Sequence, residues 1–137
     1  MKPTRGAPIV LVVDDDDAVR HVARRILESE AYAVIEASSG EEALTLLSCG
    51  MEVDLLLTDL DMPGLAGEDL AQMFRAARPD LKVLYVSGVI DRLLDERPVL
   101  GAGEAFLTKP FTHAGLLEGV ALLLFETLRK PRLSPTV

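Results

Sequence analysis

The stretch Leu55-Leu56-Leu57-Thr58-Asp59-Leu60-Asp61-Met62-Pro63-Gly64 decides how the rest of the sequence is interpreted. An apolar run ends at Asp59, and Asp61, a proline and a glycine follow directly. A buried β-strand that stops at a loop has this pattern, because apolar residues fill the strand and Pro and Gly favour the turn. We therefore expect a strand over 54–58 that places the Asp59 carboxylate at an edge of a sheet.

Outward from this stretch, apolar runs and helical repeats alternate along the chain. The other predicted strands are 9–13, 32–37, 82–86 and 104–108, and the predicted helices are 17–30, 40–50, 67–77, 91–97 and 113–130. Such alternation predicts right-handed βαβ units and a parallel sheet covered by helices on both faces. Residues 8–130 are expected to form one domain, with disordered ends at 1–7 and 131–137.

Apolar spacing also predicts which sides of the helices face the sheet. In the helix at 17–30, Val22 belongs to a set of apolar residues that recur every three or four positions. In the helix at 67–77, Met73 is predicted to point inward beside Leu70 and Phe74. Ser39 is the predicted N-cap of the helix at 40–50.

Composition limits the classes of function. The 137 residues carry a formal net charge of −8. An acidic surface argues against direct nucleic-acid binding, which needs clustered Lys and Arg. The single cysteine, Cys49, is typical of a reducing compartment. No apolar run approaches the roughly 20 residues that span a membrane. We expect a cytoplasmic protein without membrane insertion.

Charged and polar side chains follow four of the five predicted strands. Asp14 and Asp15 follow the first, Asp59 and Asp61 the third, Ser87 the fourth and Lys109 the fifth. The carboxyl ends of parallel strands meet at one edge of a sheet, where ligands bind in open α/β folds. We therefore expect these side chains to converge.

A cluster of carboxylates needs a positive charge to balance it. Like charges about 4 Å apart cost roughly 4 kcal/mol at an effective dielectric constant near 20. Oxygen ligands suit Mg²⁺ (or Mn²⁺), and Mg²⁺ bound by one or two carboxylates often shares a phosphoryl oxygen. The cluster therefore favours phosphoryl chemistry with a carboxylate as acceptor.

Four short motifs together point to a family. They are Val12-Val13-Asp14-Asp15, Leu57-Thr58-Asp59-Leu60-Asp61-Met62-Pro63-Gly64, Val86-Ser87-Gly88 and Phe106-Leu107-Thr108-Lys109-Pro110-Phe111. With these motifs the sequence resembles the receiver domain of two-component response regulators, from residue 8 to about residue 128. The resemblance implies the CheY-like, flavodoxin-like doubly wound (βα)5 fold, an α/β fold with a parallel sheet in the order 2-1-3-4-5.

The resemblance also assigns a phosphoryl acceptor and a metal site. Asp59 matches the aspartate that takes a phosphoryl group from a phosphohistidine. Asp14 and Asp15 match the acidic pair that binds Mg²⁺ beside it. The backbone carbonyl of Asp61 matches a further metal ligand, while its carboxylate has the alternative role of capping the turn at Pro63-Gly64.

Three further positions match the parts of the family that respond to the phosphoryl group. Ser87 matches the switch hydroxyl, and Lys109 matches the lysine that pairs with the phosphate. Phe106 falls where receivers carry a switch aromatic, often Tyr, so here it can act only by packing. In this family the bond between Lys109 and Pro110 is usually cis.

The implied function is a phosphoacceptor module, not an enzyme with a separate substrate. Its partner would be the phosphohistidine of a sensor kinase or of a histidine phosphotransfer domain. The responding surface would be built from the fourth helix, fifth strand and fifth helix, and the same surface is the candidate contact of a homodimer. Leu122 and Phe125 lie off the apolar side of the last predicted helix and are candidates for a partner surface. Two motifs most resemble receivers attached to hybrid sensor histidine kinases.

Three alternatives remain open at this point. One is a Mg²⁺-dependent phosphatase of the haloacid dehalogenase type, although that family places its aspartate pair after the first strand. Another is a flavodoxin-like binding protein, although the four aspartates at 14–17 would repel a bound phosphate. The third is an interaction module of the same fold that is not phosphorylated.

Overall fold

A computed structural model of the chain describes residues 6–88 and 102–129, with side chains described as far as residue 125 at the C-terminal end. The predicted helix at 91–97 and the predicted tail at 131–137 lie outside the described residues, as do residues 1–5.

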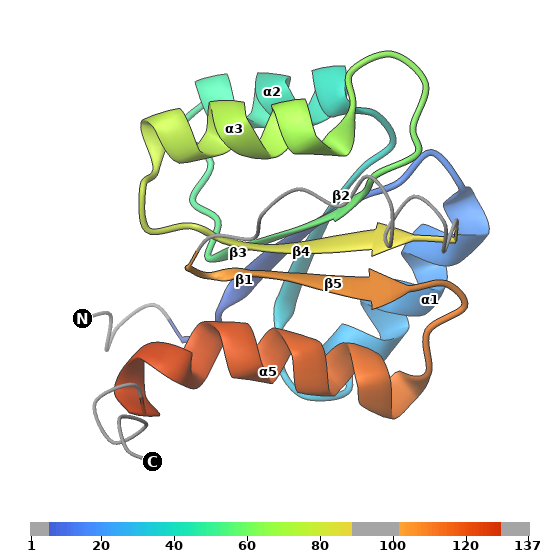
Figure 1. Ribbon diagram of the computed structural model, residues 1–137, viewed down its shortest axis with the longest axis vertical. Coiled ribbons are helices and arrows are strands. Elements are labelled where there is room, and N and C mark those ends of the chain that lie inside the picture. The colour runs from blue at the N-terminus through green and yellow to red at the C-terminus, as the bar shows by residue number, and fades with distance from the viewer. Residues whose placement is uncertain (1–5, 89–101, 130–137) are drawn as a thin grey trace.

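Five strands form one parallel sheet at the centre of the molecule (Figure 1). They are β1 (Ile9–Val13), β2 (Ala33–Ala37), β3 (Leu55–Asp59), β4 (Lys82–Ser87) and β5 (Glu104–Thr108). Their order is β2-β1-β3-β4-β5, and every neighbouring pair is parallel. The predicted sheet order is therefore confirmed. The order reverses between β1 and β3, so the carboxyl ends of these two strands flank the crevice where such folds bind ligands.

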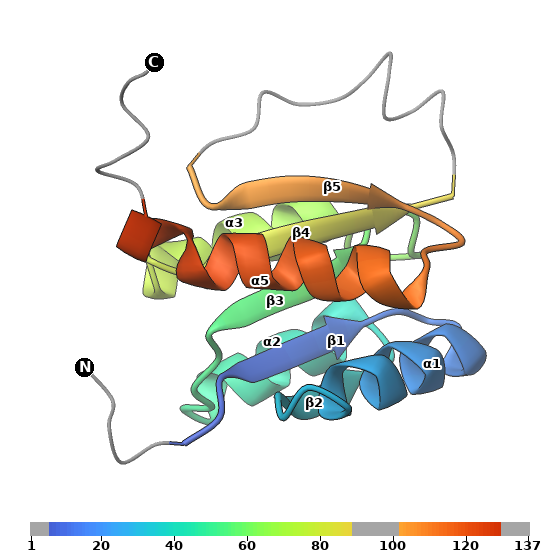
Figure 2. The ribbon, with the colours of Figure 1, turned by 90° about the horizontal axis from the view of Figure 1, so that it is seen from below.

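Helices cover both faces of the sheet. They are α1 (Asp17–Glu28), α2 (Gly40–Ser48), α3 (Gly67–Ala77) and α5 (His113–Arg129). Helices α2 and α3 lie on one face, and α1 and α5 lie side by side on the other (Figures 1 and 2). Each face has its own apolar cluster, centred on Phe74 and Leu11 beneath α2 and α3 and on Leu27 and Leu116 beneath α1 and α5.

Local signals explain where the helices begin. The Asp16 carboxylate caps α1 by accepting hydrogen bonds from the backbone N–H groups of Ala18 and Val19. Ser39 caps α2 through the N–H of Glu42 at 3.0 Å, as predicted. The Glu42 carboxylate reaches back to the N–H of Ser38, one residue before the position that a capping box requires.

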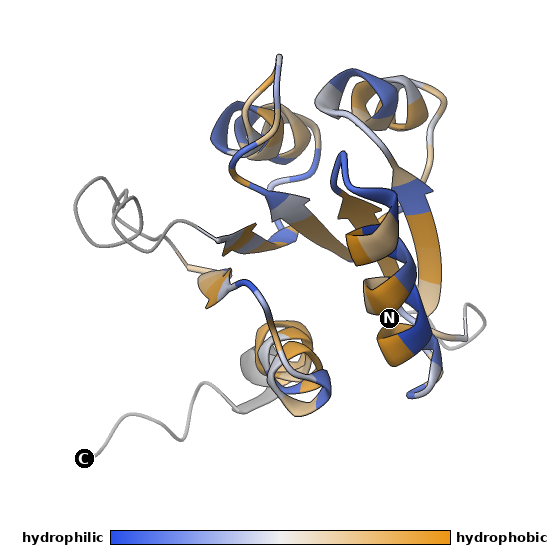
Figure 3. Ribbon diagram, turned by 90° about the vertical axis from the view of Figure 1, so that its right-hand side faces the viewer, coloured by the Kyte–Doolittle hydropathy of each residue, from blue (hydrophilic) through white to orange (hydrophobic). Residues whose placement is uncertain are grey.

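Two predicted core side chains are exposed, so those predictions are wrong. Val22 is 50% exposed and Met73 is 45% exposed. Each directly precedes a buried residue, Ala23 or Phe74, and successive helical residues project about 100° apart. The stripe of each helix that contacts the sheet is narrower than the apolar repeat suggests. Figure 3 shows α1 divided lengthwise between hydrophilic and hydrophobic residues.

In the described part of the chain, none of the helices combines the length and the apolar character needed to cross a bilayer.

Candidate functional site

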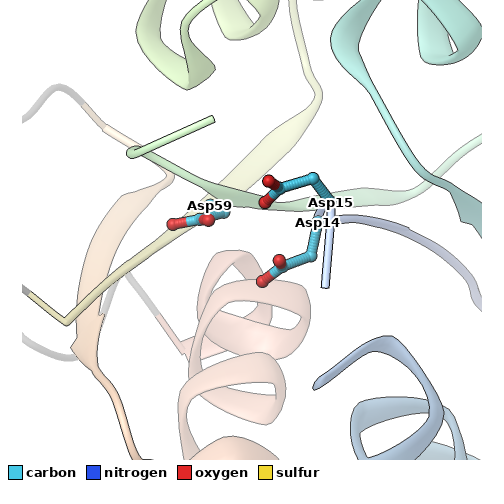
Figure 4. Close-up of side chains that lie close together, drawn as sticks. All are labelled: Asp14, Asp15 and Asp59. Atoms are coloured by element: carbon cyan, nitrogen blue, oxygen red, sulfur yellow. The ribbon is translucent and has the colours of Figure 1, made fainter. Parts of the chain in front are cut away.

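Three carboxylates meet at the carboxyl ends of β1 and β3. Asp14 and Asp15 follow β1, and Asp59 is the last residue of β3. Figure 4 shows the three side chains directed into the same space. One carboxylate oxygen from each lies within 4.8 Å of the others. The convergence expected from the strand ends is therefore present in the folded chain.

Asp14 is held in place by both its backbone and its side chain. It is 3% exposed, and its N–H donates to the carbonyl of Ala37 at the end of β2. Its Oδ1 accepts the N–H of Asp16 at 2.9 Å. Its backbone carbonyl accepts a hydrogen bond from Arg20 Nη1 at 2.8 Å. Asp14 therefore has little freedom to turn away from Asp59.

Asp59 is a buried carboxylate whose charge is only partly balanced. It is 4% exposed, and its Oδ1 accepts the N–H of Asp61 at 3.1 Å. Burial raises the pKa of Asp59, and the charge of Asp14 adds to this rise, whereas the Asp61 N–H and Lys109 oppose it. A partly compensated carboxylate of this kind is suited to receive a cation or an electrophile.

Lys109 supplies the positive charge on this edge. It follows β5, and its ammonium lies 2.9 Å from Asp14 Oδ2 and 3.4 Å from Asp59 Oδ2. Burial by itself lowers the pKa of Lys109, but the two aspartates outweigh it and the net shift is upward. The resemblance pairs Lys109 with a phosphate and gives no sign of the shorter contact with Asp14. The peptide bond between Lys109 and Pro110 is cis, as the resemblance implied.

Ser87 and Asp61 form a contact that sequence analysis did not predict. Ser87, at the end of β4, is fully buried, and its hydroxyl donates to Asp61 Oδ2 at 2.7 Å. The Asp61 carboxylate therefore accepts a hydrogen bond from Ser87, a role different from the two considered for this residue. The path of the loop at 60–66 decides this contact, and no local sequence signal encodes it.

Gly67 allows α3 to approach Asp59 closely. A Cβ atom at residue 67 would lie 2.5 Å from the backbone carbonyl oxygen of Asp59, which is closer than real Cβ contacts. Because Gly67 has no side chain, the start of α3 can pack directly against the backbone at the end of β3.

The donor set fits a hard divalent cation. Asp14, Asp15 and Asp59 offer oxygen atoms only, at mutual distances that one ion can bridge. Asp15 is exposed, so the cluster is open to solvent on one side. Mg²⁺ retains several water ligands in proteins, and an open site satisfies this requirement.

The remaining predicted residues lie farther from the carboxylates. Phe106 on β5 packs against Tyr85 on β4, with ring centroids 5.5 Å apart. Leu122 and Phe125 on α5 are 52% and 42% exposed. Their exposure fits the predicted partner surface, but no contact in the structure tests that role.

An apolar surface borders the site on the side of α1. It is a shallow hollow of about 440 Å³ lined by Ala18, Val19, Val22, Lys109, Pro110 and Phe111. We call these six residues the α1 surface. The exposed Val22, which the helical repeat placed in the core, belongs to it.

Comparison with known proteins places the chain in a family. The model of the response regulator receiver domain family matches residues 10–121. The sensor kinase CckA of Brucella abortus is 38% identical over 126 residues, which cover 91% of this chain and 13% of that protein. The transcriptional regulatory protein FixJ of Azorhizobium caulinodans is 35% identical over 90% of this chain and 58% of its own length. The chain therefore spans less than two thirds of these curated relatives.

Solved structures agree with this assignment. The receiver domain of the hybrid histidine kinase CckA matches with a TM-score of 0.71 and 36% identity, covering 85% of this chain and 98% of that one. The response regulator TrrA of Thermotoga maritima, in complex with Mg²⁺-BeF, matches with a TM-score of 0.75 and 30% identity, covering 85% and 99%. These matches do not favour the phosphatase or the flavodoxin-like alternative. The chain belongs to the family of response regulator receiver domains, the CheY-like signalling modules of two-component systems.

Proposed function

We propose that the chain is a phosphoacceptor that takes a phosphoryl group from a phosphohistidine onto Asp59. The observation that carries this proposal is the buried Asp59 carboxylate, grouped with the carboxylates of Asp14 and Asp15 and 3.4 Å from the Lys109 ammonium. Phosphoryl transfer to an aspartate requires a carboxylate nucleophile, oxygen ligands for a cation and a nearby ammonium.

In the proposed reaction, an Asp59 carboxylate oxygen attacks phosphorus and forms the O–P bond of an acyl phosphate. The P–N bond of the phosphohistidine breaks, and its electron pair stays on the imidazole nitrogen. Lys109 is placed to pair with a phosphoryl oxygen, and the Ser87 hydroxyl is placed to donate to another. Bound Mg²⁺, held by Asp14, Asp15, Asp59 and the Asp61 carbonyl, would offset the negative charge that collects on the phosphoryl oxygens.

The proposed response begins at Ser87. Phosphorylation adds about −1.5 to −2 charges at the end of β3. Ser87 would then leave Asp61, and Phe106 would repack against its neighbours on β4 and β5. The signal would pass to the surface formed by β5, α5 and the predicted helix at 91–97. Association of two copies through that surface remains a prediction.

The α1 surface is the proposed docking site for the helix that carries the donor histidine. Lys109 is part of this surface and its ammonium lies 3.4 Å from Asp59 Oδ2, so a helix docked on the α1 surface would lie close to the acceptor. The exposed apolar residue Val22 lies on the same surface and would be covered by the donor. Similarity to the CckA receiver supports a sensor kinase as the donor. It also supports a hybrid kinase as a protein in which this chain would be the receiver.

The test is phosphoryl uptake in the presence of Mg²⁺ from two donors, acetyl phosphate and a phosphorylated histidine phosphotransfer protein. Asp59→Asn is expected to abolish labelling from both. Asp16→Asn is the matched control, because it removes a neighbouring charge while keeping an N-cap residue. Labelling of Asp59→Asn at the wild-type level would refute the acceptor assignment.

The same assay tests the docking site. Val22→Glu should slow uptake from the protein donor by about tenfold or more, the loss expected when a charge enters an apolar contact, and leave uptake from acetyl phosphate unchanged. Met73→Glu, an equally exposed apolar position on the opposite face of the sheet, should affect neither donor. Equal rates for Val22→Glu and wild type with the protein donor would remove the α1 surface from the proposal.

A further inference from the structure

Arg20 reaches back from the first turns of α1 to the loop that carries the acidic pair. Its side chain is only 12% exposed. Arg20 Nη1 donates to the backbone carbonyl of Asp14 at 2.8 Å, and Nε donates to Glu36 Oε1 at 3.0 Å. A third donor, Nη2, pairs with Asp17. One guanidinium therefore joins the end of β1, the start of α1 and strand β2.

The carbonyl that Arg20 binds is in a position to control both acidic side chains. It belongs to the peptide plane between Asp14 and Asp15, so its direction sets how the chain leaves Asp14 and enters Asp15. The backbone hydrogen bonds of α1 begin later, with Arg20 N–H to the Asp16 carbonyl at 3.1 Å. The helix backbone therefore does not orient the Asp14 carbonyl, and the Arg20 side chain does.

Glu36 keeps the guanidinium in that orientation. It lies on β2 opposite Val12 of β1, and it is bonded by both Arg20 and Arg24. The hydrogen bond from Arg24, together with that from Arg20, lowers the pKa of Glu36 despite its partial burial. Arg24 lies on the same helix, has the same charge and shares the Glu36 partner, but its side chain bonds Glu28 and Glu36 rather than the Asp14 carbonyl.

We propose that Arg20 is a positioning residue that sets the Asp14–Asp15 pair for binding a divalent cation. The inference rests on the proposed function, because it takes the acidic cluster as a Mg²⁺ site. Groups that orient metal ligands from outside typically change metal affinity by about 10- to 100-fold when they are removed.

The effect of charge and the effect of position have opposite signs at Arg20. A guanidinium near a cation site repels the cation, so electrostatics alone predicts tighter metal binding when the charge is removed. Loss of positioning predicts weaker binding. Arg20→Met keeps an unbranched apolar side chain and removes the charge. Arg20→Lys keeps the charge, but a single ammonium cannot reproduce the two guanidinium hydrogen bonds that join the Asp14 carbonyl to Glu36.

The experiment is a Mn²⁺ titration of the full chain followed by electron paramagnetic resonance, which counts free Mn²⁺ and needs no phosphoryl donor. We expect the Kd of Arg20→Met to rise by about tenfold, with a smaller rise for Arg20→Lys. Arg24→Met is the matched control and should stay within about twofold of wild type, because it loses the contacts with Glu28 and Glu36 but leaves the bond from Arg20 to the Asp14 carbonyl in place. Thermal unfolding of each variant reports on general loss of structure.

The outcomes separate the inference from the proposed function. A Kd for Arg20→Met that is equal to or below the wild-type value overturns the role of Arg20 and leaves the metal site standing. Equal weakening by Arg20→Met and Arg24→Met also overturns it, because the shared Glu36 network would then explain the effect. Wild-type protein that binds no Mn²⁺ overturns both. If Arg20→Met does not fold, Arg20→Lys takes its place. A Kd for Arg20→Lys above those of wild type and Arg24→Met supports the inference, and a Kd equal to or below the wild-type value overturns it.

Discussion

The loop after β1 and the loop after β3 both deliver carboxylates to one cluster, but they are held by different means. The loop at 14–16 is fixed mainly by side-chain hydrogen bonds. The Asp16 carboxylate caps α1, and the Arg20 guanidinium binds the Asp14 carbonyl. In the loop at 60–66, close backbone packing prevails. Ala66 precedes α3 without a capping side chain, and Gly67 lies against the carbonyl of Asp59.

This difference predicts which kind of substitution would displace each carboxylate. Side-chain hydrogen bonds such as that from Arg20 to the Asp14 carbonyl each contribute about 1 kcal/mol, and their loss frees the loop to turn. A backbone contact without space for a methyl group is disturbed by added volume instead, because overpacking forces the backbone to move. We therefore expect Asp59 to be sensitive to added volume and the Asp14–Asp15 pair to be sensitive to lost hydrogen bonds.

Gly67→Ala should produce the largest change in the free energy of unfolding. The added methyl group would lie 2.5 Å from the Asp59 carbonyl oxygen, so α3 or the end of β3 has to move. We expect a loss of about 2 kcal/mol in the free energy of unfolding, the usual scale of overpacking, and slower phosphoryl uptake. Urea denaturation and labelling with acetyl phosphate measure the two effects.

Gly119→Ala is the control for that substitution. Its Cβ would lie 3.5 Å from Leu84 Cδ2, which is an ordinary contact, so only the helix propensity of alanine should matter. We expect a gain of up to about 1 kcal/mol. If Gly67→Ala were as stable as Gly119→Ala, the close approach of α3 to Asp59 would not limit this loop.

Asp59→Asn should change the free energy of unfolding by a smaller amount, and the sign of that change should depend on pH and on bound metal. The pKa of Asp59 is raised by burial, so the folded chain holds its proton more tightly than the unfolded chain does. Wild-type stability therefore falls as pH rises from the ordinary value of 3.8 through the raised pKa. Near neutral pH with EDTA, Asp59→Asn should be more stable by on the order of 1 kcal/mol, because Lys109 already offsets part of the repulsion.

The advantage of Asp59→Asn should shrink as pH falls below that window, and it should reverse when Mg²⁺ is added. A ligand at 100 times its Kd stabilises the folded state by about 2.7 kcal/mol, and only the wild type keeps all three carboxylates. Urea unfolding at several pH values, with EDTA or Mg²⁺, gives the full comparison. An advantage that does not vary with pH would show that the Asp59 charge is not what destabilises the fold.

Ala66→Ser should have the smallest effect and should make the two loops more alike. Ala66 already has the extended backbone of an N-cap, with φ −71° and ψ 153°, so a serine hydroxyl can accept a backbone N–H from the first turn of α3. We expect a gain of about 0.5 kcal/mol with unchanged phosphoryl uptake. Thermal unfolding measures the gain, and a loss of stability would mean that the loop has no room for a cap.

Much of the fold could be predicted from the sequence, because its strands are mostly apolar segments. Each strand lies within one or two residues of its predicted position, since Pro, Gly and polar residues bound every run. Val22 and Met73 were misplaced, because helical spacing gives the direction of an apolar stripe and not the width of its contact with the sheet.

The site was only partly predictable for a related reason. Strand order brings Asp14, Asp15 and Asp59 together, and a strand end is visible in sequence. The contacts of Asp61 with Ser87 and of Lys109 with Asp14 depend on the path of a loop and on rotamers. The need for glycine at residue 67 depends on a distance between two elements, which no single stretch encodes.

The hydrogen bond from Ser87 to Asp61 has a consequence for the balance between resting and signalling forms. Under the proposed function, the same hydroxyl must leave this carboxylate before it can bind a phosphoryl oxygen. A hydrogen bond to a charged acceptor contributes about 1.5–3 kcal/mol. Such a contribution corresponds to a population ratio of roughly ten to one hundred or more in favour of the resting form. Asp61 would thus set how rarely the unphosphorylated chain visits the signalling conformation by chance.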